Sequence, residues 1–285
     1  MQAEKAPLPL LKWAGGKRQL LGPILARLPQ QMDVYYEPFV GGAAVFFALA
    51  AEGRFRRAVL SDQNQELVDT YLAVKEDVEG VIRLLRKMPY SEEYYYELRE
   101  QRPRSLIKRA ARMIYLNRTG YNGLYRVNRS GKFNVPFGRY AAPKICDEPR
   151  LRLAAQALAT AQVITGDFET ISGAAGRKDA VYFDPPYAPV SSTARFSEYS
   201  QPAFGPREHE RLRDHFEKLT KRGVRSVLSN SDTAFTREVF GHLAHEFVDA
   251  RRSINSSATG RGPIQELLVF GPQRDHRARG LRNSA

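Results

Sequence analysis

The sequence holds a single cysteine, and this scarcity excludes several kinds of site. Cys146 alone can form neither a disulfide within the chain nor a CxxC metal motif. The five histidines are scattered, and none belongs to an HExxH pattern or to a cluster with acidic ligands. Because catalytic metals need such grouped ligands, we expect a function that uses no metal.

Long hydrophobic runs are also missing. The longest, Ala43–Ala51, is far shorter than the roughly 20 residues that a membrane span needs. The N-terminal MQAEKAPLP lacks the apolar segment of a signal peptide. We therefore expect a cytoplasmic protein with no membrane partner. At 285 residues and 42% hydrophobic content, the chain suits one large domain, or one domain with a sizeable insertion.

Acidic residues are absent from one long stretch. Between Arg102 and Cys146 there are eleven lysines or arginines and no aspartate or glutamate. A solvated face usually mixes both signs, whereas a single-sign block interleaved with Tyr, Asn and Gly is typical of a nucleic-acid surface. The net charge of +13 agrees, with a merely solubilising excess as the alternative. Residues 251–263 form a second basic segment without acids.

Residues 184–187 read Asp-Pro-Pro-Tyr and follow a short apolar run, Ala180–Phe183, that predicts a buried strand. Open α/β sheets bind ligands at the carboxyl ends of their strands, which is where this tetrapeptide lies. Two prolines end a sheet ladder and make a stiff turn with free carbonyl groups. Such a turn can accept two hydrogen bonds from an exocyclic amine while the tyrosine stacks on the base. The alternative is an ordinary strand-ending turn with a buried tyrosine.

Two segments predict a cofactor that contains a nucleoside. A strand at Val34–Tyr36 leads into EPFVGG and an apolar helix, Ala43–Leu49, and the glycines let the backbone approach a ligand. The next predicted strand ends at Asp62, about twenty residues beyond the glycines, where an acid can bind ribose hydroxyls. Upstream, LKWAGGK lacks the spacing of a P-loop. There Trp13 is either a core anchor or a lid over the cofactor, with Lys17 pairing with a carboxylate.

The order of predicted elements indicates an α/β fold with an insertion. Helical patterns over 65–118 interrupt the alternation of strands and helices, and a hairpin is predicted at Tyr125–Phe133, turning at 129–131. A two-stranded ribbon of this kind can enter a major groove. After the insertion, Asp167 and Phe168 follow a predicted strand at 163–165. They could pair with and stack on an adenine, or form a helix cap beside a core phenylalanine.

The motifs taken together resemble those of the Dam-type DNA adenine-N6 methyltransferases of the alpha group. The resemblance covers roughly residues 8–270 and is carried by LKWAGGK, YYEPFVGG, LSDQN, YLNRTGYNGLYRVNRSGKFNVPFGRY, GDF, YFDPPYAP, SNSDT and SSATGRGPIQELLVF. It implies a Rossmann-like methyltransferase sheet with an inserted, mainly helical DNA-recognition domain that carries a β-hairpin. The implied boundaries are 1–64 and 147–272 for the catalytic domain and 65–146 for the recognition domain, with a basic, disordered tail at 273–285.

The resemblance also implies a function and its residues. We expect site-specific, adenine-specific DNA methylation, within GATC, by a monomer that uses S-adenosylmethionine and binds double-stranded DNA. The protein would be encoded by a bacterium or a phage and associated with the nucleoid. The implied catalytic residues are Asp184, Pro185, Pro186 and Tyr187. The implied cofactor-binding residues are Trp13, Lys17, Glu37, Phe39, Gly41, Asp62, Asp167, Phe168 and Asp184. The implied DNA-binding residues are Lys12, Tyr121, Asn122, Leu124, Arg126, Pro136, Arg139 and Tyr140.

Two positions depart from the family pattern or are not assumed to match it. Many members have a glycine where this chain has Ala43, whose methyl is tolerable if φ is negative. Tyr125 lies beside the expected base-reading residues and is not assumed to match. Three alternatives stay open: methylation of cytosine N4, methylation of RNA adenine, and a DNA-binding regulator whose cofactor site is inactive.

Overall fold

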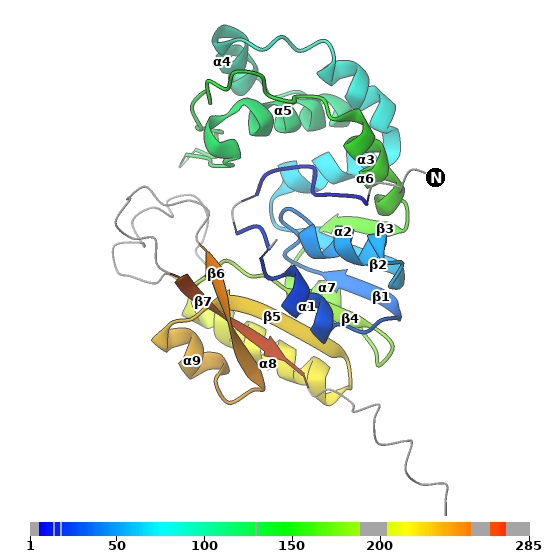
Figure 1. Ribbon diagram of the computed structural model, residues 1–285, viewed down its shortest axis with the longest axis vertical. Coiled ribbons are helices and arrows are strands. Elements are labelled where there is room, and N and C mark those ends of the chain that lie inside the picture. Colours follow the sequence, from blue (N-terminus) through cyan, green and yellow to red (C-terminus); the bar gives the residue numbers. More distant parts are fainter. Residues whose placement is uncertain are drawn as a thin grey trace, which may run out of the picture.

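A computed structural model describes residues 6–13, 15–17, 19–128, 130–188, 204–251 and 263–271. Its centre is one seven-stranded sheet with the strand order β3-β2-β1-β4-β5-β7-β6 (Figure 1). The strands are β1 (Met32–Glu37), β2 (Phe55–Asp62), β3 (Ala161–Thr165), β4 (Ala180–Phe183), β5 (Arg225–Ser231), β6 (His245–Arg251) and β7 (Pro263–Phe270). The sheet strands expected at 34–36, before Asp62, at 163–165 and at 180–183 are present as β1, β2, β3 and β4.

The first five strands of this order are parallel, whereas β7 runs antiparallel to both β5 and β6. Parallel strands place all their carboxyl ends at one edge, and the residues that follow β1, β2, β4 and β5 meet there. The sheet is the Rossmann-like methyltransferase sheet that the motifs imply.

Helices cover both faces of the sheet. They are α1 (Leu21–Arg27), α2 (Ala44–Ala51), α3 (Gln65–Leu85), α4 (Glu92–Glu100), α5 (Leu106–Thr119), α6 (Glu148–Leu158), α7 (Phe168–Ser172), α8 (Pro206–Lys221) and α9 (Ala234–Phe240). Alternate strand residues supply the two cores, because successive side chains of a strand point to opposite faces. Tyr35 packs in the core under α1 and α2, whereas Val34 and Tyr36 pack in the core that includes α8 residues.

The inserted helices stand on the sheet as a separate layer (Figure 1). Helix α3, within the helical pattern expected over 65–118, has non-helical backbone angles at Asp77 (φ −147°, ψ 70°), which divide it into two segments. The Asp77 carboxylate accepts the Gly80 N–H at 2.8 Å and so caps the second segment. Buried residues of α3 and α5 continue the core of the α1–α2 face without a gap. We keep 65–146 as a proposed recognition domain, built on a core that it shares with the sheet.

The expected hairpin is present as two short antiparallel segments, in which Asn128 N–H donates to Lys132 O at 2.8 Å and Asn134 N–H donates to Arg126 O at 3.0 Å. An isolated antiparallel bridge joins Val127 to Phe133, and a second joins Gly120 to Phe137. Asn128 closes the turn, since its side chain accepts the N–H groups of Ser130 and Lys132 at 3.0 Å each. These side-chain bonds add to the backbone hydrogen bonds that pair the two segments.

Two expectations lie wholly or mostly outside the described residues: the basic segment at 251–263, of which 252–262 are not described, and the tail at 273–285. Among the helices in the described ranges, none is both long enough and apolar enough to cross a membrane.

Candidate active site and nucleic-acid interface

The candidate active site lies at the carboxyl edge of the sheet. Strand β4 ends at Phe183, and Asp184 begins the turn that follows. Its parallel neighbour β1 ends at Glu37, and the next strand, β2, ends at Asp62. The fold therefore brings together three acids that are far apart in sequence, as the strand-end positions predict.

Asp184 is held by partners from two other segments. Its Oδ1 lies 2.9 Å from Lys17 Nζ and accepts the Ser229 hydroxyl at 3.2 Å. The Ser229 hydroxyl also lies 2.8 Å from that of Tyr182. Burial raises the pKa of Asp184, while Lys17 and the Ser229 hydrogen bond act in the opposite direction. The side chain keeps 21% exposure, so the carboxylate is fixed in place and still reachable.

The tyrosine of the turn is also anchored. The Tyr187 hydroxyl donates to Glu266 Oε2 on β7 at 2.5 Å. The next peptide is clamped on both sides, because Ala188 N–H donates to Asn230 Oδ1 at 3.2 Å and the Ser231 hydroxyl donates to Ala188 O at 2.8 Å. A ring held at its hydroxyl and through the following peptide is preorganised for stacking.

Lys17 joins the two ends of this turn. Besides its ion pair with Asp184, its Nζ lies 4.5 Å from the centre of the Tyr187 ring and donates to Gly15 O at 2.5 Å. Lys17 is 5% exposed. The expected pairing of Lys17 with a carboxylate is therefore present, and its partner is Asp184.

The glycine loop after β1 is fixed by Asp62 and covered by the tryptophan. The Gly41 N–H donates to Asp62 Oδ2 at 3.1 Å, and the Tyr71 hydroxyl donates to Gly41 O at 2.8 Å. A Cβ on Gly41 would lie 2.9 Å from Trp13 Cδ1, so this approach requires glycine. Burial raises the pKa of Asp62, opposed by backbone N–H donors of which Asn64 is the strongest.

Ala43 does not have the backbone angle that its methyl group tolerates best. Its φ is 56° and its ψ 33°, which is the left-handed region. An L-residue other than glycine is disfavoured there, by about 1–2 kcal/mol. The condition of a negative φ is therefore not met, and the loop carries local strain next to α2.

Glu37 is buried behind the loop. It is 2% exposed, and its Oε2 accepts the Tyr35 hydroxyl at 2.8 Å and the Phe46 N–H at 3.0 Å. Burial raises its pKa to about 8, and the charge of Asp184 adds to this, while the Tyr35 and Phe46 hydrogen bonds oppose it. Glu37 thus ties the strand end to α2, and its place in the cofactor pocket stays a prediction.

Asp167 and Phe168 show both features of the alternative interpretation, a helix-capping aspartate and a buried phenylalanine. Asp167 caps α7 by accepting the Glu169 N–H at 3.0 Å, and it pairs with Arg211. Phe168 is 2% exposed, and its ring centre lies 5.6 Å from that of Phe39 and 4.4 Å from the Arg211 guanidinium. Their role as cofactor contacts remains a prediction, as does that of the half-buried Phe39.

The expected DNA-binding residues are Lys12, Tyr121, Asn122, Leu124, Arg126, Pro136, Arg139 and Tyr140, and we call them the recognition cluster. Asn117, which is 1% exposed, ties two parts of it together. Its side chain accepts the Lys12 N–H at 2.8 Å and donates to Lys12 O at 2.8 Å and Gly123 O at 2.9 Å. A Cβ on Gly123, whose φ is +64°, would lie 2.4 Å from the Lys12 side chain.

The other limb of the recognition cluster is joined by backbone hydrogen bonds. Tyr121 N–H donates to Pro136 O at 2.8 Å, next to the bridge between Gly120 and Phe137. The Tyr140 hydroxyl donates to Gly120 O at 3.1 Å, and Lys12 Nζ lies 5.2 Å from the Tyr140 ring centre. The structure thus gathers residues from 12 to 140 into one surface.

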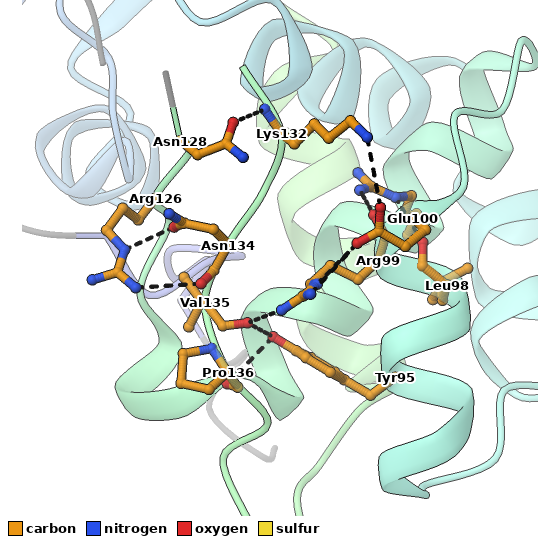
Figure 2. A network of polar contacts seen from close by, with 11 residues as sticks. Tyr95, Leu98, Arg99, Glu100, Arg126, Asn128, Lys132, Asn134, Val135 and Pro136 are labelled. Atoms are coloured by element: carbon orange, nitrogen blue, oxygen red, sulfur yellow. Dashed lines mark hydrogen bonds and ion pairs between the residues drawn. The ribbon is translucent and has the colours of Figure 1, made fainter. Parts of the chain in front are cut away.

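Most members of the recognition cluster are exposed to solvent, Tyr121 by 53%. Arg126 Nε donates to Asn134 Oδ1 at 2.7 Å across the turn (Figure 2). Arg139 lies 3.5 Å from the Glu92 carboxylate. The side chains are therefore available to a ligand, whereas the backbone that carries them is fixed.

Comparison with known proteins agrees with this geometry. Residues 13–254 match the family of D12 class N6 adenine-specific DNA methyltransferases. The chain belongs to this family. A Type II methyltransferase, M.MjaIII of Methanocaldococcus jannaschii, is 39% identical over 92% of this chain and 98% of its own length. The Type II methyltransferase M1.LlaDCHI of Lactococcus lactis subsp. cremoris is 39% identical over 92% and 94%. The DNA adenine methylase of Escherichia coli is 38% identical over 91% and 94%.

As a member of this family the protein methylates adenine in DNA, and S-adenosylmethionine is the methyl donor that such an enzyme uses. The residues at the sheet edge suit this donor. Burial raises the pKa values of Glu37, Asp62 and Glu266, and the nearby charge of Asp184 raises them further, so four carboxyl groups share one small region with the Lys17 ammonium. A ligand that carries a sulfonium and an ammonium group would relieve this repulsion.

Four residues that orient the predicted ones were not expected from the sequence. Glu266, Ser229, Asn117 and Arg211 hold Tyr187, Asp184, Lys12 and Asp167 respectively. Glu266 and Ser229 lie within motifs singled out from the sequence, QELLVF and SNSDT, which was the available signal. Arg211 lies in a helix with no such motif.

Proposed function

We propose that the protein is a site-specific methyltransferase that acts on the N6 amine of a flipped adenine, within GATC, in double-stranded DNA. The observation that carries this proposal is the turn at 184–187, where an accessible carboxylate and an anchored aromatic ring face the same lysine. An adenine N6 inside a duplex is out of reach of such a recessed turn, so the base must leave the stack at a cost of a few kcal/mol. We also propose that the enzyme acts as a monomer.

In the proposed reaction, Tyr187 offsets part of the flipping cost by stacking on the adenine. Stacking of a base on an aromatic side chain contributes about 1–3 kcal/mol. The hydrogen bond to Glu266 holds the ring at its hydroxyl end and leaves its faces for the base. Lys17 Nζ now occupies the position over the ring and beside the carboxylate. The target amine takes over these contacts when the base enters.

Asp184 acts on the amine itself. The N6 lone pair is delocalised into the purine and is a poor nucleophile. Hydrogen bonds from N6–H to the Asp184 carboxylate and the Pro185 carbonyl favour a pyramidal nitrogen, whose lone pair is free. The carboxylate also stabilises the positive charge that develops on this nitrogen. When bound, S-adenosylmethionine would supply the methyl group: the bond from its sulfur to the methyl carbon breaks, S-adenosylhomocysteine leaves, and the methylated amine loses one proton to solvent.

The choice of base is assigned to the recognition cluster. An arginine in the major groove pairs with guanine O6 and N7, and apolar groups contact the thymine methyl. Arg126 is exposed and its guanidinium is steered by Asn134, while Leu124 and Pro136 are the apolar members. This donor and apolar set suits a site that contains guanine and thymine, such as GATC.

Plasmid DNA treated with the protein and S-adenosylmethionine tests this proposal. Digestion with GATC-cleaving enzymes that are blocked by adenine methylation, dependent on it or indifferent to it identifies the site. We expect protection from the first enzyme, cleavage by the second and no change with the third. Mass spectrometry of the nucleosides separates N6-methyladenine from N4-methylcytosine, and parallel treatment of RNA tests the RNA alternative. N6-methyladenine outside GATC would overturn the proposed site, and no methylated nucleoside at all would overturn the proposed activity.

A further inference from the structure

Tyr125 lies between the cofactor loop and the base-reading surface. It directly precedes Arg126, and these neighbours face opposite ways: Arg126 is exposed, whereas Tyr125 packs inward and is half-buried. Successive side chains in an extended segment alternate in this manner. Because the two residues are joined by one peptide group, a displacement of the Tyr125 ring also moves Arg126, the residue that is proposed to read a base.

On its inner side Tyr125 stacks on Trp13, with ring centres 5.3 Å apart and planes inclined by 23°. Trp13 in turn lies on the glycine loop, since a Cβ on Gly41 or Gly42 would come within 2.9 or 3.1 Å of its side chain. The loop is stiff, because Gly41 is bonded to Asp62 through its N–H. A ligand that moves this loop cannot leave the Trp13–Tyr125 stack unchanged.

The hydroxyl of Tyr125 connects through Glu66 and Arg112 to the end of helix α4. It donates to Glu66 Oε2 at 3.1 Å, and Glu66 Oε1 pairs with Arg112 at 3.3 Å. Arg112 is 6% exposed and donates to Leu98 O at 3.0 Å and to Arg99 O at 2.6 Å, at the end of α4.

Helix α4 then holds the strand opposite Arg126. The Tyr95 hydroxyl donates to Val135 O at 2.8 Å, and Arg99 reaches the same carbonyl at 3.5 Å (Figure 2). Asn134, the residue before Val135, accepts the hydrogen bond from Arg126 Nε. Tyr125 therefore reaches the glycine loop through Trp13, on which its ring stacks, and the frame of the base reader through its hydroxyl.

We propose that Tyr125 is a positioning residue that couples cofactor binding to base selection. This inference rests on the proposed function. With the cofactor in place, the glycine loop and Trp13 fix the Tyr125 ring, and this holds Arg126 in its reading position. By thermodynamic reciprocity, cognate DNA must then tighten cofactor binding by the same factor. A tyrosine that served packing alone would support both sites without linking their affinities.

The test measures the affinity for S-adenosylhomocysteine, which allows no turnover, with and without a GATC duplex. Trp13 is the only tryptophan of the sequence, so intrinsic fluorescence reports directly on the stack. For the wild type we expect the duplex to tighten binding by about fivefold or more. In Tyr125→Leu, which removes the stack and the hydroxyl, this factor should fall to about one. Tyr125→Phe keeps the ring and should retain part of the coupling.

A matched control removes another aromatic ring from the same region. Phe137 packs on Tyr90 and Tyr95, with ring centres 5.1 and 5.4 Å apart, away from Trp13. Phe137→Leu should lower thermal stability as Tyr125→Leu does, and leave the coupling factor at the wild-type value. A second measurement is the ratio of the methylation rate on GATC to the rate on a duplex with one altered base. This ratio should fall by about tenfold in Tyr125→Leu and stay unchanged in Phe137→Leu.

The outcomes separate this inference from the proposed function. If the wild type produces no N6-methyladenine, the proposed function fails and this inference fails with it. If the wild type methylates GATC but shows no coupling, or if Tyr125→Leu keeps both coupling and discrimination, only the role of Tyr125 is overturned. Equal loss of coupling in Phe137→Leu would also overturn it, because the effect would then follow general loosening of the region.

Discussion

The sheet edge and the recognition cluster differ in how far their functional side chains are buried and in what holds them in place. At the edge, Lys17 and Glu37 are 5% and 2% exposed, and each functional side chain is held by other side chains. In the recognition cluster, Tyr121 is 53% exposed, and the order comes from backbone contacts and from Asn117. Chemistry on an amine needs charges fixed in a site with little water, whereas reading a base needs free side chains on a fixed backbone.

This difference predicts that changes at the edge alter the rate and changes in the recognition cluster alter the choice of sequence. A single residue that did both in equal measure would break the comparison, apart from Tyr125, which touches both regions.

The largest effect is expected at Asp184. Asp184→Ala removes the acceptor of N6–H and the charge that stabilises the developing cation, and the rate of methylation should fall by about 10³-fold or more. The fold should persist, because the turn is still held through Ala188. Single-turnover rates with labelled methyl donor measure the loss, and gel shifts measure duplex binding. Asp184→Asn keeps the volume of the side chain and one acceptor oxygen. Its methylation rate should therefore be somewhat higher than that of Asp184→Ala but still far below that of the wild type. Near-wild-type turnover by either variant would contradict the mechanism.

The second effect concerns Arg126. Arg126→Ala removes a groove-facing guanidinium, and discrimination at one base pair should relax by about 1–3 kcal/mol. The maximal rate on GATC should change far less than in Asp184→Ala. Competition between GATC and duplexes with one altered base measures the ratio. Lys132→Ala is the control, because it removes one positive charge from the same turn. Lys132 is exposed, and its ion pair with Glu100 is long, at 4.0 Å. If both variants lost affinity equally for all sequences, Arg126 would be a phosphate contact.

What the sequence could reveal differs between these regions for a physical reason. Asp62 and Asp184 end parallel strands, and parallel strands share one carboxyl edge, so their meeting follows from local patterns alone. The partner of Tyr187 does not follow in this way, because Glu266 is 79 residues away and comes into reach through the antiparallel register of β7 with β5.

The same limit applies to the hairpin and to Phe168. The residue pattern predicts the hairpin at 125–133, and backbone pairing is present there, but the bonds from the Asn128 side chain that also close the turn do not follow from propensity alone. A phenylalanine after a strand is compatible with stacking or with a core position. In the structure Arg211 of α8 covers the ring, a contact that the local sequence does not reveal, and the role of Phe168 as a cofactor contact stays a prediction.

A third prediction uses the buried acid at the edge. Glu37 has a pKa of about 8 in the folded protein, against 4.5 ordinarily, so the folded state binds its proton more tightly than the unfolded state. This contribution to stability is fully present below the ordinary pKa and is lost as pH rises through about 8. Between these values the free energy of unfolding should fall by up to about 1.4 kcal/mol per pH unit.

Urea unfolding at several pH values between these limits measures this slope. Glu37→Gln retains an acceptor for Tyr35 and Phe46 but cannot titrate, so its stability should depend less on pH. Glu92→Gln, an exposed change beside the recognition cluster, should leave the slope of the wild type unchanged. Identical slopes in the wild type and Glu37→Gln would show that this acid does not titrate in the range.

The smallest effect is expected at Ala43, where the edge meets the glycine loop. Its φ of 56° is strained for alanine, and glycine adopts this angle freely. Ala43→Gly should therefore raise the free energy of unfolding by up to about 1 kcal/mol, less the loss of one buried methyl group. Ala44→Gly, one residue on and inside α2, should instead lower it by about 0.5–1 kcal/mol. Thermal and urea unfolding of the two variants compare these signs. If both variants were destabilised alike, the left-handed angle would not be a source of strain, and the fixed geometry of the loop would have to come from Trp13 and Asp62 alone.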